Sequence, residues 1–144
     1  MLQLCDVSAV VGVDAELDER LVNDVSETEN VIVSQWREVS ADEQHELRHR
    51  FYEIVRPHGF ETRLVVLRRA NSIALYFICL TLSAVMSLRD QWRSRRQLRG
   101  IVEELFTLLS GVTRRVWVKR LTWLLTDYER CLEVFSSVHG KQID

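Results

Sequence analysis

The chain has 144 residues, of which 47% are hydrophobic and 28% charged, and its formal net charge is −2. This length and composition predict a single domain with one hydrophobic core and exclude disorder over most of the chain. The three cysteines are widely spaced and odd in number, and the N-terminus lacks the basic region of a cleaved signal, so we expect a reduced, cytoplasmic protein.

The first part of the chain predicts a lead-in, a strand and a helix. Residues 1–28 are acidic and weakly patterned, and we expect them to be loosely ordered. Asn30–Trp36 is rich in valine and isoleucine, which favours the first strand. Ser40, followed three residues later by Glu43, fits a capping box that would start a helix ending near Pro57.

The second part predicts a hairpin followed by two helices with a strand between them. The strands cover 61–69 and 73–80, the next helix begins between 83 and 88 and ends before Gly111, the fourth strand covers 112–119, and the last helix begins at Leu121. We therefore predict an α+β two-layer sandwich over residues 29–139, followed by a tail at 140–144. Its four-stranded antiparallel sheet carries helices on one face, in the order strand, helix, strand, strand, helix, strand, helix.

Ser72–Leu88 contains 17 residues without a charge, and this is the stretch to test as a membrane segment. A spanning helix needs about 20 predominantly apolar residues. The serine and threonine positions within this run instead suit a strand followed by the start of a helix. We therefore expect no membrane segment.

One pattern matches a catalytic motif. His45, Glu46 and His49 satisfy H-E-x-x-H, in which two imidazoles bind zinc and the glutamate acts as general base. On a helix these histidines would lie opposite the apolar stripe, and Arg48 and Arg50 would repel a divalent cation. A small zinc peptidase is an alternative, but we favour a solvated helix face and expect no metal.

Other catalytic chemistry has little support in the sequence. Cys79 and Cys131 lie in apolar contexts that are typical of core thiols, and Cys5 lies in the acidic lead-in. The glycines form neither a G-x-G-x-x-G pattern nor a P-loop. We therefore predict no catalytic residue, no cofactor and no enzymatic activity.

The order of elements also occurs in the RNA-recognition motif, which offers a second alternative. That motif carries a basic and glycine-rich aromatic run on its third strand, and Ser72–Cys79 has neither a basic residue nor a glycine. The basic residues gather instead on predicted helices and on the fourth strand: Arg89, Arg93, Arg95, Arg96, Arg99, Arg114, Arg115, Lys119 and Arg120. Of the 19 basic residues 17 are arginine, which hints at protein contacts.

The third strand is apolar on both faces. One set comprises Ile73, Leu75, Phe77 and Cys79, and the other comprises Ala74, Tyr76, Ile78 and Leu80. A strand exposed on one face usually alternates with polar residues. The second set therefore needs cover from the lead-in, from another protein or from a second copy of the chain.

Residues 124–132 read L-L-T-D-Y-E-R-C-L, and this run is similar to the last helix of the TRADD N-terminal domain family. The resemblance extends over residues 30–138. It implies a non-enzymatic adaptor module of death or innate-immune signalling that docks its open sheet face on the TRAF domain of a trimeric adaptor. The residues that it assigns to this contact are Ile32, Ser34, Val66, Arg68, Ala74, Tyr76, Ile78, His139 and Gln142.

Overall fold

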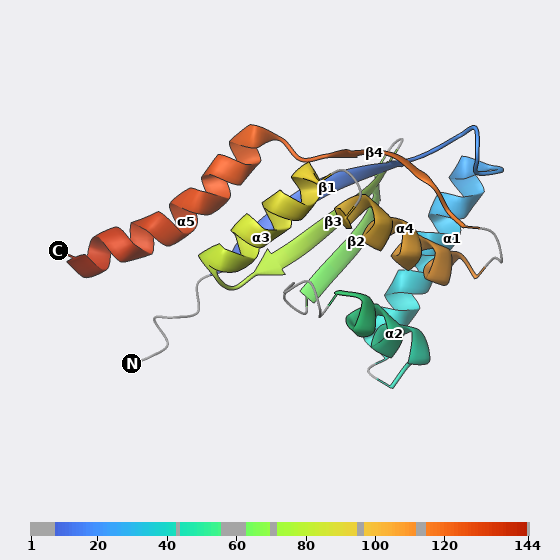
Figure 1. Ribbon diagram of the computed structural model, residues 1–144. Coiled ribbons are helices and arrows are strands. Elements are labelled where there is room, and N and C mark those ends of the chain that lie inside the picture. The colour runs from blue at the N-terminus through green and yellow to red at the C-terminus, as the bar shows by residue number, and fades with distance from the viewer. Residues whose placement is uncertain are drawn as a thin grey trace.

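The structure is a computed structural model that describes residues 8–42, 44–55, 63–69, 72–94, 97–111 and 115–143. For residues 54, 55, 63 and 137–143 it describes the backbone alone. The described residues form four strands and five helices (Figure 1): β1 (Ala9–Leu17), α1 (Val25–Ala41), α2 (Glu46–Val55), β2 (Arg63–Arg69), β3 (Ser72–Cys79), α3 (Leu82–Arg93), α4 (Gln97–Ser110), β4 (Val118–Thr122) and α5 (Leu125–Ile143).

The strands form one antiparallel sheet in the order β2-β3-β1-β4. β3 pairs with β2 along its length and with β1 on its other side, so Leu75 lies opposite both Val66 and Val13. Figure 1 shows α3 and α4 in front of the strands, while α5 continues past the end of the sheet. The predicted α+β class, with a four-stranded antiparallel sheet backed by helices, is confirmed.

The predicted lead-in is wrong, because residues 9–17 form β1 between β3 and β4. Its side chains alternate between buried and more exposed positions, and Val11 and Val13 point into the core. The carboxylates at Asp14 and Glu16 fall on the alternate positions, so they do not interrupt the buried row. This segment therefore does contain a strand pattern, but its acidic composition led us to predict that it is loosely ordered.

The predicted first strand is also wrong, since Asn30–Trp36 lies inside α1. Asp24 caps this helix: its backbone is left-handed, with φ 46°, and its carboxylate accepts a hydrogen bond from the amide of Glu27 at 3.1 Å. The buried residues of α1 are spaced as on a helix face: Glu29, Ile32, Val33, Trp36 and Val39. Burial of this face overrides the strand preference of the valine-rich run.

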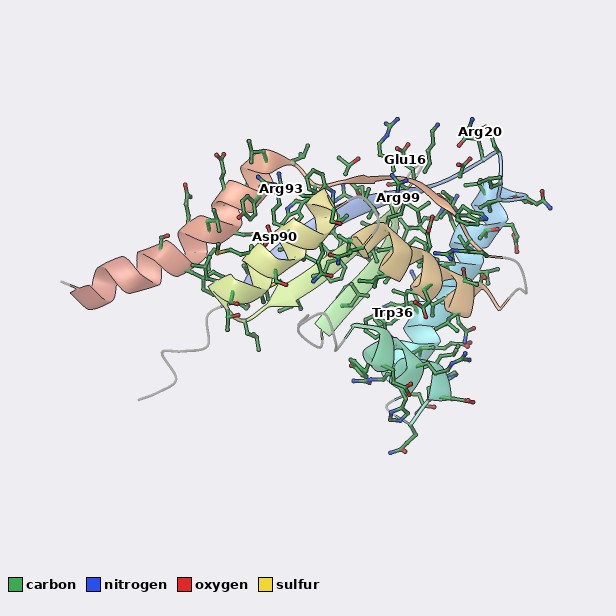
Figure 2. All side chains as sticks on the ribbon, viewed as in Figure 1. Glu16, Arg20, Trp36, Asp90, Arg93 and Arg99 are labelled. Atoms are coloured by element: carbon green, nitrogen blue, oxygen red, sulfur yellow. The ribbon has the colours of Figure 1, made fainter. Side chains whose placement is uncertain are left out.

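The capping box at Ser40 does not start a helix. Ser40 lies in the last turn of α1, where its hydroxyl donates to the carbonyl of Arg37 at 3.3 Å. α2 begins at Glu46 and packs against α1 through Phe51, whose ring centroid lies 5.2 Å from that of Trp36. Figure 2 labels Trp36 where α1 meets α2. Pro57, predicted to end this helix, lies outside the described residues.

The C-terminal half follows the prediction with shifted boundaries. The long helix predicted up to residue 110 is divided into α3 and α4, and Gly111 ends α4 with φ 68° as expected. The fourth strand lies at Val118–Thr122, and α5 begins at Leu125 and continues through the predicted tail to Ile143. Within the described ranges no helix is long and apolar enough to cross a membrane, and Ser72–Leu88 forms β3 and the start of α3.

The hydrophobic core lies between the helices and one face of the sheet, which we call the covered face. Six strand residues on this face are at most 1% exposed: Val11, Val13, Ala15, Val66, Ile73 and Leu75. Ile32 of α1, Leu88 of α3, and Leu98 and Phe106 of α4 are buried with them. Burial of the valine, leucine, isoleucine and phenylalanine side chains among them contributes about 1.5–3 kcal/mol each and stabilises the two-layer arrangement.

Buried polar groups hold α4 against the segment that leads into β4. The carboxylate of Glu103, 5% exposed, accepts the amide of Val118 at 2.8 Å and pairs with Arg115 at 3.1 Å. One turn further along, the hydroxyl of Thr107 accepts the amide of Val116 at 2.8 Å. These contacts fix the path of the chain at the edge of the sheet.

Candidate functional site

The second face of the sheet, which we call the open face, is the strongest candidate for a functional site. The strand register places the side chains of alternate residues on it: Val10, Gly12, Asp14 and Glu16 of β1, Val65, Leu67 and Arg69 of β2, Ala74, Tyr76 and Ile78 of β3, and Arg120 and Thr122 of β4. Tyr76 lies at the centre of this set, opposite Gly12 on one side and Val65 on the other.

The open face combines apolar side chains with high exposure. Val10 is 56% exposed, Val65 40% and Leu67 44%, while Tyr76 and Ile78 are partly exposed. The described parts of the chain therefore leave these residues without a covering layer. Contiguous exposed apolar residues on a folded domain mark sites of interaction.

Tyr76 lies along the sheet and packs over β1. A Cβ atom added at Gly12 would lie 3.2 Å from Cε1 of Tyr76, so the ring occupies the space that a side chain would take there. The tyrosine hydroxyl accepts a hydrogen bond from Arg69 at 2.7 Å, and Arg69 Nε lies 4.0 Å from a carboxylate oxygen of Asp14. The hydrogen bond to Tyr76 raises the pKa of Arg69, which keeps the guanidinium charged beside the ring.

Beside Tyr76 the open face has a small hollow of about 130 Å³, which lies between the strands and the start of α5. Its lining residues are Gly12, Val13, Asp14, Arg69, Ala74, Tyr76, Thr122, Leu124 and Asp127. Pockets that bind small molecules usually measure about 300–1,000 Å³, so this hollow is too small for most of them. It fits a single side chain of a protein partner better than a metabolite.

α5 follows the edge of β1 where β4 ends. The thiol of Cys131 lies 3.6 Å from the carbonyl oxygen of Val10, and Cys131 is 5% exposed. Burial, together with the nearby Asp127, raises the pKa of Cys131 and keeps the thiol protonated. Cys79 and Cys131 are both buried, at 3% and 5% exposure, which confirms the prediction that these thiols lie in the core.

Three residues of the predicted partner surface, Ala74, Tyr76 and Ile78, lie on the open face, but Val66 and Arg68 lie on the covered face. Val66 is 1% exposed, and Arg68 pairs with Glu29 of α1 at 3.3 Å. Because Val66 lies opposite Leu75, the even-numbered residues of β2 share a face with the odd-numbered residues of β3. The prediction assigned the wrong face to these two β2 residues.

The remaining predicted residues lie elsewhere. Ile32 is fully buried in α1 and Ser34 is exposed on the same helix, so neither belongs to a sheet face. His139 and Gln142 fall in α5, where their side chains lie outside the described residues. The nine predicted residues therefore do not form one continuous surface.

Sequence reasoning missed the β1 and β2 residues that complete the open face. Val10 belonged to the segment expected to be loosely ordered, and the choice of Val66 and Arg68 for the open face left Val65 and Leu67 out of it. The alternation of Val65 and Leu67 with Leu64 and Val66 reveals two apolar faces in β2 but does not say which one the helices cover. Only the register with β3 decides it.

The zinc motif does not form a metal centre in the described structure. His45 precedes α2 and uses its Nδ1 atom to accept the amide of Leu47 at 3.1 Å, and His49 is exposed. Across the described ranges, no three or more His, Cys, Asp or Glu residues are arranged to hold a metal ion. The geometry gives the zinc peptidase alternative no support.

The RNA-recognition alternative requires several aromatic rings on the open face. Tyr76 is the one aromatic residue among the open-face positions that the structure describes. A single ring does not provide the stacked aromatic platform typical of that motif.

No family model matches this chain, and comparisons with curated proteins and with solved structures found no significant match. Function must therefore be argued from the open face itself.

Proposed function

We propose that this chain is a non-enzymatic protein–protein interaction module that binds a partner protein through the open face of its sheet. The observation that carries the proposal is the exposure of Val10, Val65 and Leu67, at 56%, 40% and 44%, on a face whose opposite side is fully packed. An apolar sheet face of this kind is stabilised when another protein removes it from water.

The centre of the open face would supply most of the binding energy. Tyr76 is held in place by Gly12 and Arg69, so little of its freedom is left to lose on binding. Partly buried aromatic residues in preorganised positions are typical binding hot spots. Val65 and Ile78 would surround this anchor and exclude water.

The charged residues of the open face would orient the partner more than they would strengthen binding. Arg69 lies 4.0 Å from Asp14, and Arg120 lies 3.4 Å from Glu16. Both pairs are exposed and internally compensated, and exposed pairs contribute at most about 1 kcal/mol. The surface therefore favours a partner with a complementary apolar patch over a strongly charged one.

For the identity of the partner we propose the TRAF domain of a trimeric adaptor, in a cytoplasmic complex of death or innate-immune signalling. This rests on the resemblance of residues 124–132 to the TRADD N-terminal domain family. It is supported by the position of Leu124 and Leu125, which are 59% and 56% exposed at the start of α5, with Leu124 lining the hollow next to Tyr76. A partner seated on the open face could contact both.

The test is titration calorimetry of the purified chain with TRAF domains, combined with light scattering after size exclusion. We compare Leu67→Asp with Leu21→Asp, because Leu21 is 60% exposed in the turn before α1 and off the sheet. We expect Leu67→Asp to weaken binding more than about tenfold, since it places a charge in the interface, and Leu21→Asp to leave it unchanged.

Light scattering separates the other outcomes. A monomer that binds no TRAF domain would overturn the choice of partner. A dimer that ignores TRAF domains and is disrupted by Leu67→Asp would show that the open face binds a second copy of the chain. A dimer or complex that Leu67→Asp leaves intact would overturn the role of the open face itself.

A further inference from the structure

A groove away from the open-face hollow is lined mainly by arginine. It has a volume of about 440 Å³ and lies where α3 ends, α4 begins and β4 passes, and its lining residues are Trp92, Arg93, Arg99, Arg120 and Leu121. This volume falls within the range of about 300–1,000 Å³ that small-molecule sites occupy. No carboxylate is among these lining residues.

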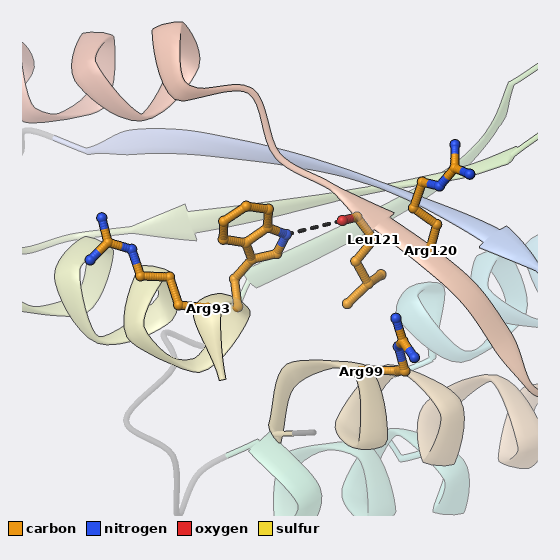
Figure 3. Close-up of a pocket in the computed structure, with 5 residues that line it drawn as sticks. Arg93, Arg99, Arg120 and Leu121 are labelled. Atoms are coloured by element: carbon orange, nitrogen blue, oxygen red, sulfur yellow. Dashed lines mark hydrogen bonds between the residues drawn. The ribbon is translucent and has the colours of Figure 1, made fainter. Parts of the chain in front are cut away.

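Trp92, which lines the groove, is held in place by its neighbours. The indole nitrogen of Trp92 donates to the carbonyl of Leu121 at 3.1 Å, which Figure 3 marks as a dashed line. The ring of Trp92 also meets that of Trp123 edge to face, with centroids 6.3 Å apart. The guanidinium of Arg89 lies 4.3 Å from the centroid of the Trp92 ring. A ligand would therefore meet a preformed surface.

Arg89 adds a buried positive charge next to the Trp92 ring. It is 6% exposed, its guanidinium lies 4.9 Å and 4.7 Å from the ring centroids of Trp123 and Tyr128, and it donates to the carbonyl of Trp123. Among the residues that the structure describes, no carboxylate pairs with it. Burial lowers the pKa of Arg89, and repulsion from Arg93 lowers it further.

The lining arginines are themselves poorly compensated. Within the described ranges Arg93 has no ion pair. This includes Asp90 of the same helix, which Figure 2 also labels. Among the described residues, Arg99 donates only to the carbonyl of Lys119, at 3.4 Å. Arg120 pairs with Glu16 at 3.4 Å, but its side chain is 63% exposed, so this pair exchanges readily with water or with a ligand. The groove therefore attracts anions.

The arrangement of the guanidinium groups indicates the class of anion. Figure 3 shows the guanidinium of Arg93 on one side of the indole that donates to Leu121 and that of Arg99 on the other side, while the guanidinium of Arg120 points away from that of Arg99. A ligand that reaches both sides must carry more than one anionic group. Guanidinium matches phosphate in geometry and binds it through paired hydrogen bonds.

We propose that this groove binds a chain of two or more phosphate groups, either as inorganic polyphosphate or as the phosphates of a nucleotide. Arg93 binds one end of the chain and Arg99 the other, with Arg120 at the rim. Arg120 also lies on the open face, so it is the lining residue that this site shares with the surface proposed for the protein partner. Its signal in the sequence was the cluster of arginines after residue 88, which by itself could not show that a groove gathers three of them.

The test is titration calorimetry of the full chain with tripolyphosphate at an ionic strength of about 0.15 M, where diffuse attraction is largely screened. Arg93→Gln and Arg99→Gln are compared with Arg130→Gln, an arginine of α5 that is 75% exposed and pairs with Asp127. We expect saturable binding that each groove variant weakens about tenfold and that Arg130→Gln leaves unchanged. Thermal unfolding of each variant confirms that the fold is intact.

Three further results decide the proposal. The absence of saturable binding, or equal weakening by Arg130→Gln, would overturn the site. Equally tight binding of orthophosphate would overturn the requirement for more than one phosphate. ATP separates the two sources of ligand: binding tighter than that of tripolyphosphate assigns the site to a nucleotide, and equal binding assigns it to the phosphate chain, and both results support the site.

Discussion

The two faces of the sheet are built from the same kinds of residue but have opposite surroundings. Val65 is 40% exposed and its neighbour Val66 1%, and Val10 is 56% exposed and its neighbour Val11 0%. These are adjacent valines in the same strands, so residue type cannot account for the difference. The helices bury one face and leave the other exposed. On the proposed function, this arrangement separates stability from binding within a single sheet.

This division implies that substitutions on the covered face act on folding, whereas substitutions on the open face act on association. Matched pairs of identical residues in different surroundings test it. The expected effects range from a loss of several kcal/mol of stability for a core leucine to a change in the pH dependence of stability for a buried carboxylate.

The largest effect should come from a pair of leucines. Leu75 is fully buried and Leu67 is 44% exposed. Leu75→Ala leaves a cavity in the core and should lower the free energy of unfolding by about 3 kcal/mol, whereas Leu67→Ala should lower it by less than about 1 kcal/mol. Urea denaturation of the two variants measures the difference. Equal losses would mean that the open face is covered in solution.

A second pair tests the hydrogen bond that holds α4 against β4. Glu103 is 5% exposed and accepts the amide of Val118, while the next residue, Glu104, is exposed. Glu103→Ala leaves that amide without an acceptor and should cost about 2 kcal/mol. Glu104→Ala should change stability by no more than about 0.5 kcal/mol. Equal melting temperatures for the two variants would mean that β4 does not depend on this contact with α4 for its position.

A third pair compares two glycines. Gly100 lies in α4 with no atom within 4 Å of an added Cβ, so Gly100→Ala should stabilise the protein by about 0.5–1 kcal/mol. At Gly12 the added Cβ would lie 3.2 Å from the ring of Tyr76, so the ring must shift by a few tenths of an ångström, which disturbs its hydrogen bond with Arg69. We expect Gly12→Ala to cost about 1 kcal/mol. A stabilising effect at Gly12, seen in thermal denaturation, would show that Tyr76 is not held in place.

The smallest effect should be a change in pH dependence at Glu29. Burial raises the pKa of its carboxyl, and the ion pair with Arg68 offsets only part of that rise. A folded-state pKa above the unfolded one means that the folded protein binds the proton more tightly. The stability that this carboxyl contributes is therefore full at low pH and is lost as pH rises from about 4.3 through the raised pKa.

Glu29→Gln cannot ionise and should remove this loss, so its free energy of unfolding should improve relative to wild type as pH rises from about 4 to 7. Glu38→Gln, at an exposed position of the same helix, serves as the control and should follow the wild-type curve. Urea denaturation over this pH range measures both variants. A relative loss for Glu29→Gln at pH 7 would mean that the pair with Arg68 outweighs the cost of burial.

The sequence determined the features that depend on local patterns. The hairpin of β2 and β3, the end of α4 at Gly111, the two apolar faces of β3 and the buried thiols followed from spacing and residue type, because these signals lie within a few consecutive residues. They were sufficient for the α+β class of the fold.

Only the tertiary structure decided which residues share a surface. The acidic composition of residues 9–17 concealed the strand pattern of β1, and the valine-rich run in α1 was predicted as a strand. Both predictions failed because burial against distant elements overrides local propensity. The register of β2 against β3 placed Val66 in the core and Val65 outside, and a shift of one residue would reverse them. A contact between segments far apart in the chain fixes that register, and no local pattern contains it.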